Sequence, residues 1–113
     1  MATIIYHNPR CSKSRQTLAL IEESGLTPTI VEYLKDPPSK SALKDILFKL
    51  GMVARDIVRK KEAKEAGLDI ATMTDAAIIK AMAEHPAIIE RPIVVSGNKA
   101  VIGRPPENIL EIL

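Results

Sequence analysis

The chain has 113 residues, which is enough for one domain with a hydrophobic core of its own. Its 16 basic and 14 acidic residues leave a net charge of +2, and aromatic residues make up only 3% of the chain. Nucleic-acid-binding proteins typically carry a strong basic patch, and those that bind single strands stack bases on aromatic side chains. We therefore expect no nucleic-acid partner, and any basic site must be a local one.

The sequence shows no feature of export or of membrane insertion. Residues 1–10 already include His7 and Arg10, so no basic segment followed by a long apolar stretch is present to form a signal peptide. The apolar runs elsewhere are too short to span a membrane. Cys11 is the only cysteine, so the chain forms no internal disulfide. Together these features indicate a cytoplasmic protein whose thiol stays reduced.

The first third of the chain predicts a strand, a helix and a second strand. Residues 3–7 are short and rich in β-formers, and residues 12–23 carry apolar positions at helical spacing before Gly25 ends the run. Residues 29–34 read as the next strand. Because a helix joins the two strands, we expect them to be parallel in a right-handed β–α–β unit.

The middle of the chain, at about residues 39–85, predicts a helical segment. Asp36-Pro37-Pro38 interrupts the chain before it. A first helix has Leu43, Ile46, Leu47 and Leu50 on one face and Gly51 at its end. Residues 56–66 predict one or two short, highly charged helices, and residues 74–84 predict a longer one with Ile78, Ala81 and Met82 on one face.

Strand patterns return in the last quarter. Residues 92–95 and 100–103 flank a Ser-Gly-Asn corner that is typical of an antiparallel hairpin, and Pro105-Pro106 opens a final helix over residues 107–113. The order βαβ, helices, ββα predicts an α/β, thioredoxin-like fold, with a mixed four-stranded sheet and helices on both faces. No linker or repeat divides the chain, so we expect residues 1–113 to form a single domain with the helical insertion packed on the same core.

Cys11 is the strongest candidate for a reactive residue. It stands where a strand stops and a helix begins, so unpaired backbone N–H groups and the positive end of the helix dipole should point at its sulfur. Arg10, Lys13 and Arg15 add positive charge nearby. We expect its pKa to fall below the ~8.5 of a free thiol, which favours the nucleophilic thiolate. The alternative is an inert, buried apolar cysteine.

Three arginines, Arg59, Arg91 and Arg104, stand where short elements end. Guanidinium groups match tetrahedral oxyanions through paired N–H donors, so three of them near one thiolate would bind a small oxyanion that the thiolate attacks. The fold leads us to expect a cis peptide bond at Pro92, facing the cysteine. The alternative is that these arginines are solvated surface groups. His7 is either a histidine at the edge of the core or a charge that helps to hold the thiolate.

Several other chemistries have no support in the sequence. Cys11-Ser12-Lys13-Ser14 lacks the second cysteine of a dithiol redox site, so an external thiol must complete any redox cycle. The spacing from Cys11 to Arg15 is shorter than the phosphate loop of tyrosine phosphatases. Two histidines and one cysteine without ligand spacing argue against zinc, and no phosphate-binding glycine motif indicates a nucleotide. We therefore expect neither a metal nor a bound cofactor.

These motifs resemble the glutaredoxin-coupled arsenate reductase family, in its short form that ends soon after the final helix. The resemblance spans essentially the whole chain and rests on residues 5–15, 58–60, 90–95 and 102–107. It implies a thioredoxin-like fold in which Cys11 attacks arsenate and forms a thiol ester. Glutathione would then enter as the second thiol, and glutaredoxin would reduce the mixed adduct and release arsenite.

The resemblance also implies roles for individual residues. Arg59, Arg91 and Arg104 match the oxyanion-binding arginines of the family. The family's cysteine loop, which stabilises the thiolate or the bound anion, is matched by His7, Asn8, Ser14 and Arg15.

Two other functions remain open at this stage. One is a glutathione-dependent thiol oxidoreductase whose acceptor is not arsenate, for which Arg59 and Arg104 would matter little. The other is a non-enzymatic protein-binding module similar to the Spx-type transcription regulators, which share the fold and bind RNA polymerase. In that case Cys11→Ser would preserve function, whereas changes on the helical insertion would not.

Overall fold

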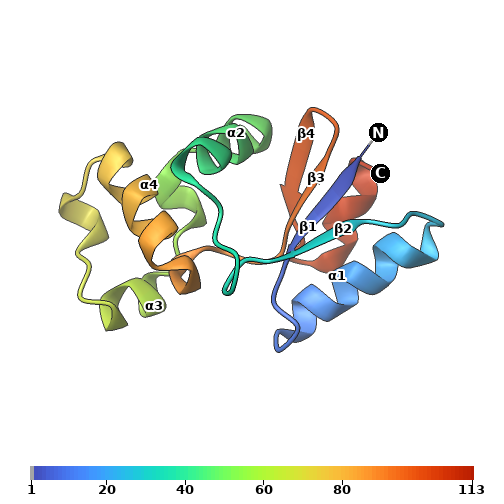
Figure 1. Cartoon of the computed structure of the whole chain (residues 1–113), viewed down its shortest axis with the longest axis horizontal. Coiled ribbons are helices and arrows are strands. Elements are labelled where there is room, and N and C mark those ends of the chain that lie inside the picture. Colours follow the sequence, from blue (N-terminus) through green and yellow to red (C-terminus); the bar gives the residue numbers. More distant parts are fainter. Residues whose placement is uncertain (1) are drawn as a thin grey trace. The chain divides into compact units, whose positions relative to one another are not determined.

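The computed structural model describes residues 2–113, and the chain divides into two compact units (Figure 1). One unit joins the N-terminal part of the chain, up to Asp36, with residues 91–113. The other is the continuous segment Pro37–Glu90. The sequence analysis expected one domain in which the helical segment packs on the core of the sheet, and this packing stays a prediction.

The first unit contains a mixed four-stranded sheet with the strand order β2-β1-β3-β4. β1 runs parallel to β2 and antiparallel to β3, and β3 runs antiparallel to β4, as the sequence predicts. In the register, Ile5 of β1 lies opposite Ile30 of β2 and Val94 of β3. The strands are β1 (Thr3–His7), β2 (Thr29–Glu32), β3 (Ile93–Ser96) and β4 (Lys99–Ile102).

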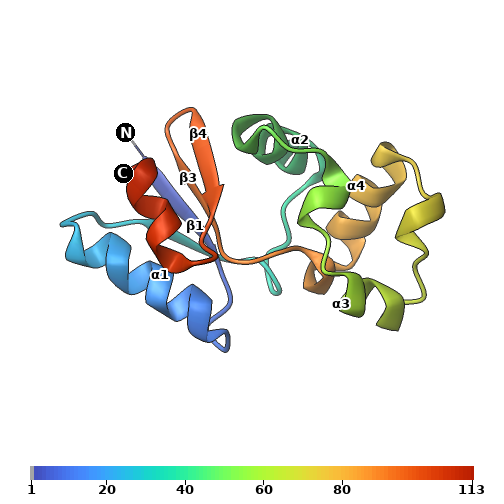
Figure 2. The same ribbon diagram turned by 180° about the vertical axis from the view of Figure 1, so that it is seen from behind.

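Two helices pack on the same face of this sheet (Figures 1 and 2). α1 (Ser12–Glu23) follows β1, and a 3₁₀ helix, η4 (Pro106–Glu111), follows β4. Side chains from the two central strands and both helices meet there in a fully buried apolar cluster, which fixes the direction in which α1 leaves β1 and so the position of Cys11. The cluster consists of Ile5, Ile21, Val94 and Ile109.

The second unit consists of helices. Its elements are α2 (Lys40–Leu50), η1 (Ala54–Ile57), α3 (Lys60–Glu65), η2 (Ile70–Thr72), α4 (Asp75–Glu84) and η3 (Pro86–Ile88). Ser39 and Thr74 cap α2 and α4, because each side-chain oxygen accepts a hydrogen bond from the backbone three residues later. Gly51 ends α2 with a φ of 68°, a conformation that suits glycine. The helical segment predicted at about residues 39–85 is therefore confirmed.

The third and fourth strands lie within one residue of the prediction, and two other boundaries differ in a way that has a structural reason. The second strand ends at Glu32 rather than at residue 34, because the carbonyl of Glu32 accepts hydrogen bonds from the N–H groups of Lys35 and Asp36 and turns the chain. The final helix is a 3₁₀ helix that ends at Glu111, rather than a helix that reaches Leu113. Neither change alters the topology of the sheet.

Within residues 2–113, none of the helices has both the length and the apolar character that crossing a membrane requires.

Candidate active site around Cys11

Cys11 occupies the N-cap position of α1, directly after the turn that follows β1. Its backbone is extended, with φ −93° and ψ 122°, while its carbonyl already accepts the first hydrogen bond of the helix, from the N–H of Arg15 at 3.0 Å. Its own N–H donates to the carbonyl of Asn8 at 3.0 Å and closes the turn. The half-buried sulfur therefore lies at the positive end of a helix of 12 residues, as the sequence predicts.

This position favours the thiolate. Burial alone would raise the pKa of Cys11, yet the pKa is lowered on balance. The backbone N–H groups of Ser14 and Lys13 donate hydrogen bonds to the sulfur, and the Arg91 guanidinium both hydrogen-bonds to it and attracts its negative charge. Because the thiolate is the nucleophilic form, Cys11 has the character of a reactive thiol rather than of an inert core residue.

Arg91 and Arg104 both reach Cys11 from the opposite end of the chain. The Nη2 atom of Arg104 lies 3.6 Å from the Cys11 sulfur. The Nε atom of Arg104 donates to the carbonyl of Arg91 at 2.7 Å. This bond holds together the segment before β3 and the segment after β4. The Arg91–Pro92 bond is cis, and so is Arg104–Pro105, which the sequence analysis did not single out. Two of the three predicted arginines thus lie beside the thiol.

The loop before Cys11 is organised around the hydroxyl of Ser14, whose side chain is fully buried. The Ser14 Oγ accepts a hydrogen bond from the N–H of Asn8 at 3.0 Å and shares another, of 2.7 Å, with the Nδ1 atom of His7. Arg15 is exposed and donates from Nη1 to the carbonyl of Pro9 at 2.9 Å. Four of the predicted residues, His7, Asn8, Ser14 and Arg15, therefore shape the loop.

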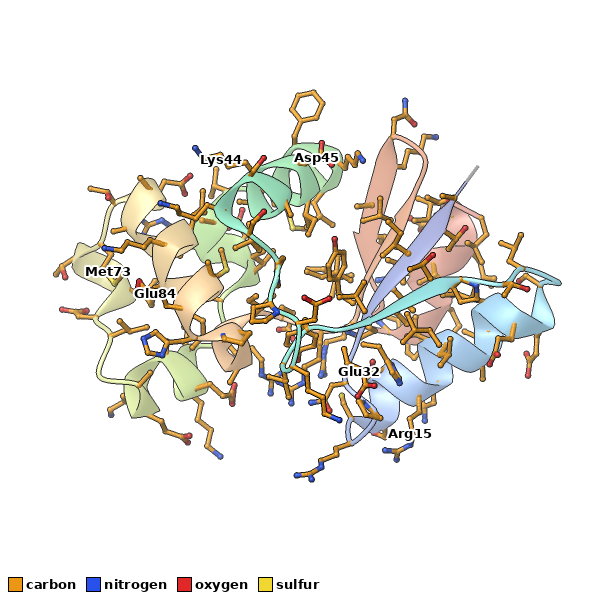
Figure 3. All side chains as sticks on the ribbon, viewed as in Figure 1. Arg15, Glu32, Lys44, Asp45, Met73 and Glu84 are labelled. Atoms are coloured by element: carbon orange, nitrogen blue, oxygen red, sulfur yellow. The ribbon has the colours of Figure 1, made fainter. Side chains whose placement is uncertain are left out.

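His7 is a buried histidine at the end of β1, with only 6% of its surface exposed. Burial lowers its pKa below the usual 6.5; the negative charge of Glu32 opposes this and the positive charge of Arg15 adds to it. Arg15 on α1 and Glu32 on β2 are both labelled in Figure 3. His7 is therefore mostly neutral at neutral pH, and it acts on the loop through its hydrogen bond to Ser14 rather than as a charge.

Two further residues, Gly103 and Asn108, position Arg104, and the sequence analysis named neither of them for this role. Gly103 packs so closely on α1 that a Cβ atom there would lie 2.6 Å from the Oγ1 of Thr17 and 2.9 Å from Cγ of Pro92. The side chain of Asn108 donates to the carbonyl of Arg104 at 3.0 Å. A glycine at the end of a strand is a recognised signal of close backbone approach and was the one clue in the sequence.

Arg59 belongs to the helical unit, where its side chain contacts two carboxylates. Its Nε atom lies 2.6 Å from Glu62 and its Nη1 atom 2.9 Å from Glu90. Burial lowers the pKa of Arg59, but the two carboxylates outweigh this and raise it. The predicted role of Arg59 beside Cys11 stays a prediction, because the residue lies in the other compact unit.

Among residues 2–113, no group of three or more histidine, cysteine, aspartate or glutamate side chains is arranged to hold a metal ion. The chemistry that the first unit offers is that of a thiolate with two adjacent guanidinium groups. Guanidinium groups bind tetrahedral oxyanions by paired, charge-assisted hydrogen bonds. The arrangement suits the capture of a small oxyanion and its attack by sulfur.

Comparison with known proteins finds relatives over nearly the whole chain. The sequence pattern of the ArsC family matches residues 6–112. Two relatives named arsenate reductase are each 51% identical: one from Haemophilus influenzae, with all of both chains covered, and one from Neisseria meningitidis, with 96% of both covered. The solved structure titled arsenate reductase from Vibrio cholerae is 49% identical and has a TM-score of 0.94, with 100% of this chain and 98% of that one covered. The resemblance noted in the sequence is confirmed, as is the thioredoxin-like fold, and the chain belongs to the ArsC family.

Proposed function

We propose that this protein reduces arsenate to arsenite, with glutathione and glutaredoxin as its thiol partners. The observation that carries the proposal is the Cys11 sulfur at the N-terminus of α1, with the Arg91 guanidinium hydrogen-bonded to it and Nη2 of Arg104 at 3.6 Å. Close relatives bear the name arsenate reductase, which supports the choice of oxyanion.

In the proposed reaction, the Cys11 thiolate attacks arsenic and forms a sulfur–arsenic bond with loss of water. Glutathione adds a second sulfur–arsenic bond with loss of another water. A glutaredoxin thiolate then attacks the glutathione sulfur, and the electron pair of that sulfur–arsenic bond passes to arsenic, which is reduced from As(V) to As(III). Hydrolysis of the remaining bond releases arsenite and regenerates Cys11. The two electrons come from glutathione and glutaredoxin, which leave as a mixed disulfide.

An external thiol is required because the chain has a single cysteine. Dithiol enzymes close an intramolecular disulfide, whereas the position three residues after Cys11 is occupied here by Ser14. Ser14 instead shapes the loop through its hydrogen bonds to His7 and Asn8. This dependence on reduced thiols also leads us to propose a cytoplasmic location.

In this proposal, Arg91 and Arg104 bind the oxyanion and stabilise the charge that develops on its oxygens during the attack. Arg59 is the third oxyanion ligand. Charged hydrogen bonds of this kind contribute about 1.5–3 kcal/mol each, so the loss of either residue beside Cys11 should weaken both binding and turnover.

The test is arsenite formation from arsenate by the purified protein with glutathione and glutaredoxin, beside Cys11→Ser. We expect turnover only when both thiol partners and Cys11 are present, while Cys11→Ser still binds arsenate. Turnover that survives in Cys11→Ser would exclude the covalent mechanism. No turnover by a wild-type protein whose Cys11 alkylates as a low-pKa thiol would favour a different acceptor.

A further inference from the structure

A small hollow of about 190 Å³ lies in the first unit, between the loop before Cys11 and the end of β2. Sites that enclose a whole small ligand usually measure about 300–1,000 Å³, so this hollow has room for one end of a longer ligand. The residues that line it all precede Pro37 and belong to one compact unit. Those with polar side chains are His7, Asn8, Arg10, Glu32 and Lys35.

The charged side chains around the hollow carry both signs. Arg10 and Lys35 are positive, and Glu32, the last residue of β2, is negative (Figure 3). The Lys35 Nζ atom is 3.9 Å from Glu32 Oε1, and the two side chains are 83% and 45% exposed. Because so long and so exposed an ion pair contributes little, each group remains able to pair with a charge on a ligand. Two cations beside one carboxylate match a ligand head that has both a carboxylate and an ammonium group.

His7 adds a hydrogen-bond donor, whose position follows from its contact with Ser14. The Ser14 hydroxyl is fully buried and already accepts the N–H of Asn8. Among residues 2–113, its own proton has one acceptor, the Nδ1 atom of His7 at 2.7 Å. Because buried hydroxyl groups keep their hydrogen bonds, Nδ1 accepts this proton, and the neutral ring then carries its own proton on Nε2. Nε2 is not closed off from solvent, so its N–H can donate to a ligand in the hollow.

We propose that this hollow binds glutathione by its γ-glutamyl end. The inference rests on the proposed function, in which glutathione is the second thiol. The α-carboxylate of glutathione pairs with Lys35 and accepts the Nε2–H of His7, while the neighbouring ammonium group pairs with Glu32. Arg10 adds positive charge for a ligand that has two carboxylates and one ammonium group.

The hollow suits glutathione in its selectivity and in its place along the chain. Glu32 attracts an ammonium group and repels a simple oxyanion, so the hollow favours a zwitterionic head over arsenate. The residues from Asn8 to Arg10, which line the hollow, lead directly into Cys11. The thiol of a glutathione held there stays within about 10 Å of the hollow, the length of an extended tripeptide.

The test measures the binding of S-methylglutathione by calorimetry at neutral pH, since its blocked thiol excludes any reaction with the protein. Glu32→Gln is the decisive variant, because it makes the protein more positive. General electrostatic attraction of a ligand with a net negative charge would then increase. Loss of the partner of the ammonium group should instead raise the Kd, roughly three- to tenfold. Lys35→Met should raise the Kd by a similar factor, because it removes the partner of the carboxylate.

Glu22→Gln and Lys99→Met are the matched controls. They remove the same charges from exposed residues of the first unit that do not line the hollow, and Lys99 lies on β4, at the opposite edge of the sheet from β2. Both should leave the Kd near the wild-type value. The N-acetyl derivative of S-methylglutathione has no ammonium group, so Glu32→Gln should bind it no more weakly than the wild type does.

Shortened ligands identify the end that binds. S-methyl-γ-glutamylcysteine keeps the γ-glutamyl head and should bind roughly tenfold more tightly than S-methylcysteinylglycine, which lacks it. Free glutamate has the same head without the part that extends along the loop before Cys11, so it should bind more weakly than S-methylglutathione. A glutamate Kd as low as that of S-methylglutathione would indicate a site for amino acids and overturn the assignment to glutathione. The proposal is also wrong if S-methylglutathione does not bind the wild type, or if Glu32→Gln leaves its Kd unchanged or lower.

The two proposals fail in different ways. Failure of arsenate reduction appears as a wild-type protein that forms no arsenite with both thiol partners. Failure of the glutathione site appears in the comparison of Kd values, which requires no reaction. Where arsenite does form, Glu32→Gln should raise the KM for glutathione more than the KM for arsenate, and the opposite order would contradict the glutathione site alone.

Discussion

The Nδ1 atom of His7 lies 2.7 Å from the Oγ of Ser14, and this pair joins the last residue of β1 to the first turn of the helix that carries Cys11. The same hydroxyl accepts the N–H of Asn8, so one buried side chain satisfies two polar groups of the cysteine loop. Because unsatisfied polar groups are costly when buried, the loop has one favourable shape. That shape places the N–H groups of Lys13 and Ser14 at the sulfur.

Ser14→Ala should lower the free energy of unfolding by about 1–3 kcal/mol, because it leaves the His7 ring nitrogen and the Asn8 N–H without their partner in the interior. Urea denaturation at pH 7 measures the change. Ser12→Ala, at an exposed position in the same turn, is the matched control and should stay within about 0.5 kcal/mol of the wild type. Equal stability of Ser14→Ala and Ser12→Ala would contradict this role.

His7 should make the fold less stable as the pH falls. Burial lowers the pKa of His7 in the folded state, so the unfolded chain, with an ordinary pKa of about 6.5, takes up a proton first. The stability that depends on neutral His7 is therefore complete above about pH 6.5 and is lost as the pH falls towards the folded-state pKa, with a slope of at most about 1.4 kcal/mol per pH unit.

Denaturation of the wild type and His7→Gln between pH 7 and pH 5 checks this assignment. In the variant, the free energy of unfolding should depend less steeply on pH, because glutamine does not titrate. The same loss of slope in His85→Gln, at the exposed second histidine, would contradict the assignment to His7.

Most elements of the fold were predictable because each has a local pattern. α2 and α4 bury Leu43, Ile46, Ile78 and Met82 on the faces that the apolar spacing indicates, and the hairpin turns at Gly97 with a φ of 62°. The sequence did not reveal that the last helix is a 3₁₀ helix, because a run of six or seven residues does not distinguish a 3₁₀ helix from an α-helix.

The site was predictable only in part, because its contacts are not local. Cys11 and Arg104 stood out as members of motifs, but 93 residues separate them, and only the fold brings them to 3.6 Å. The carboxylates of Glu62 and Glu90 were hidden among ordinary surface charges of the sequence. The contact of Glu90 with Arg59 depends on a backbone bridge that no local pattern indicates.

Arg91 and Arg104 should both increase the reactivity of Cys11. Arg91 lowers the pKa of the thiol by a hydrogen bond and by its charge, and Arg104 places Nη2 3.6 Å from the sulfur. Arg91→Ala and Arg104→Ala should each slow alkylation by iodoacetamide at pH 7 roughly three- to tenfold, because less thiolate is present. The rate measured across pH should show a midpoint above that of the wild type.

Arg10→Ala is the control for this measurement, since Arg10 is exposed and adjacent to Cys11 in sequence but its side chain is not among the groups that lower the thiol pKa. Its alkylation rate should stay close to that of the wild type. If the three alanine variants slow alkylation equally, general positive charge rather than the two positioned guanidinium groups governs the thiol.

Gly103→Ala should destabilise the fold and disturb Arg104, because the added Cβ would lie 2.6 Å from the Thr17 Oγ1 and 2.9 Å from the Pro92 Cγ. Overpacking of this kind costs about 1–3 kcal/mol of the free energy of unfolding. Since Arg104 follows directly, its contact with Cys11 should loosen, and alkylation of Cys11 at pH 7 should slow.

The Thr17→Ala background tests whether the contact with Thr17 causes these effects, because it removes both Thr17 atoms that the new Cβ would meet and keeps the contact with Pro92. In a double-mutant cycle followed by urea denaturation and alkylation rate, Gly103→Ala should cost less in that background than in the wild type, with an interaction free energy of about 0.5–3 kcal/mol. A cost that is the same in both backgrounds would show that the close approach of Gly103 to α1 is not what positions Arg104.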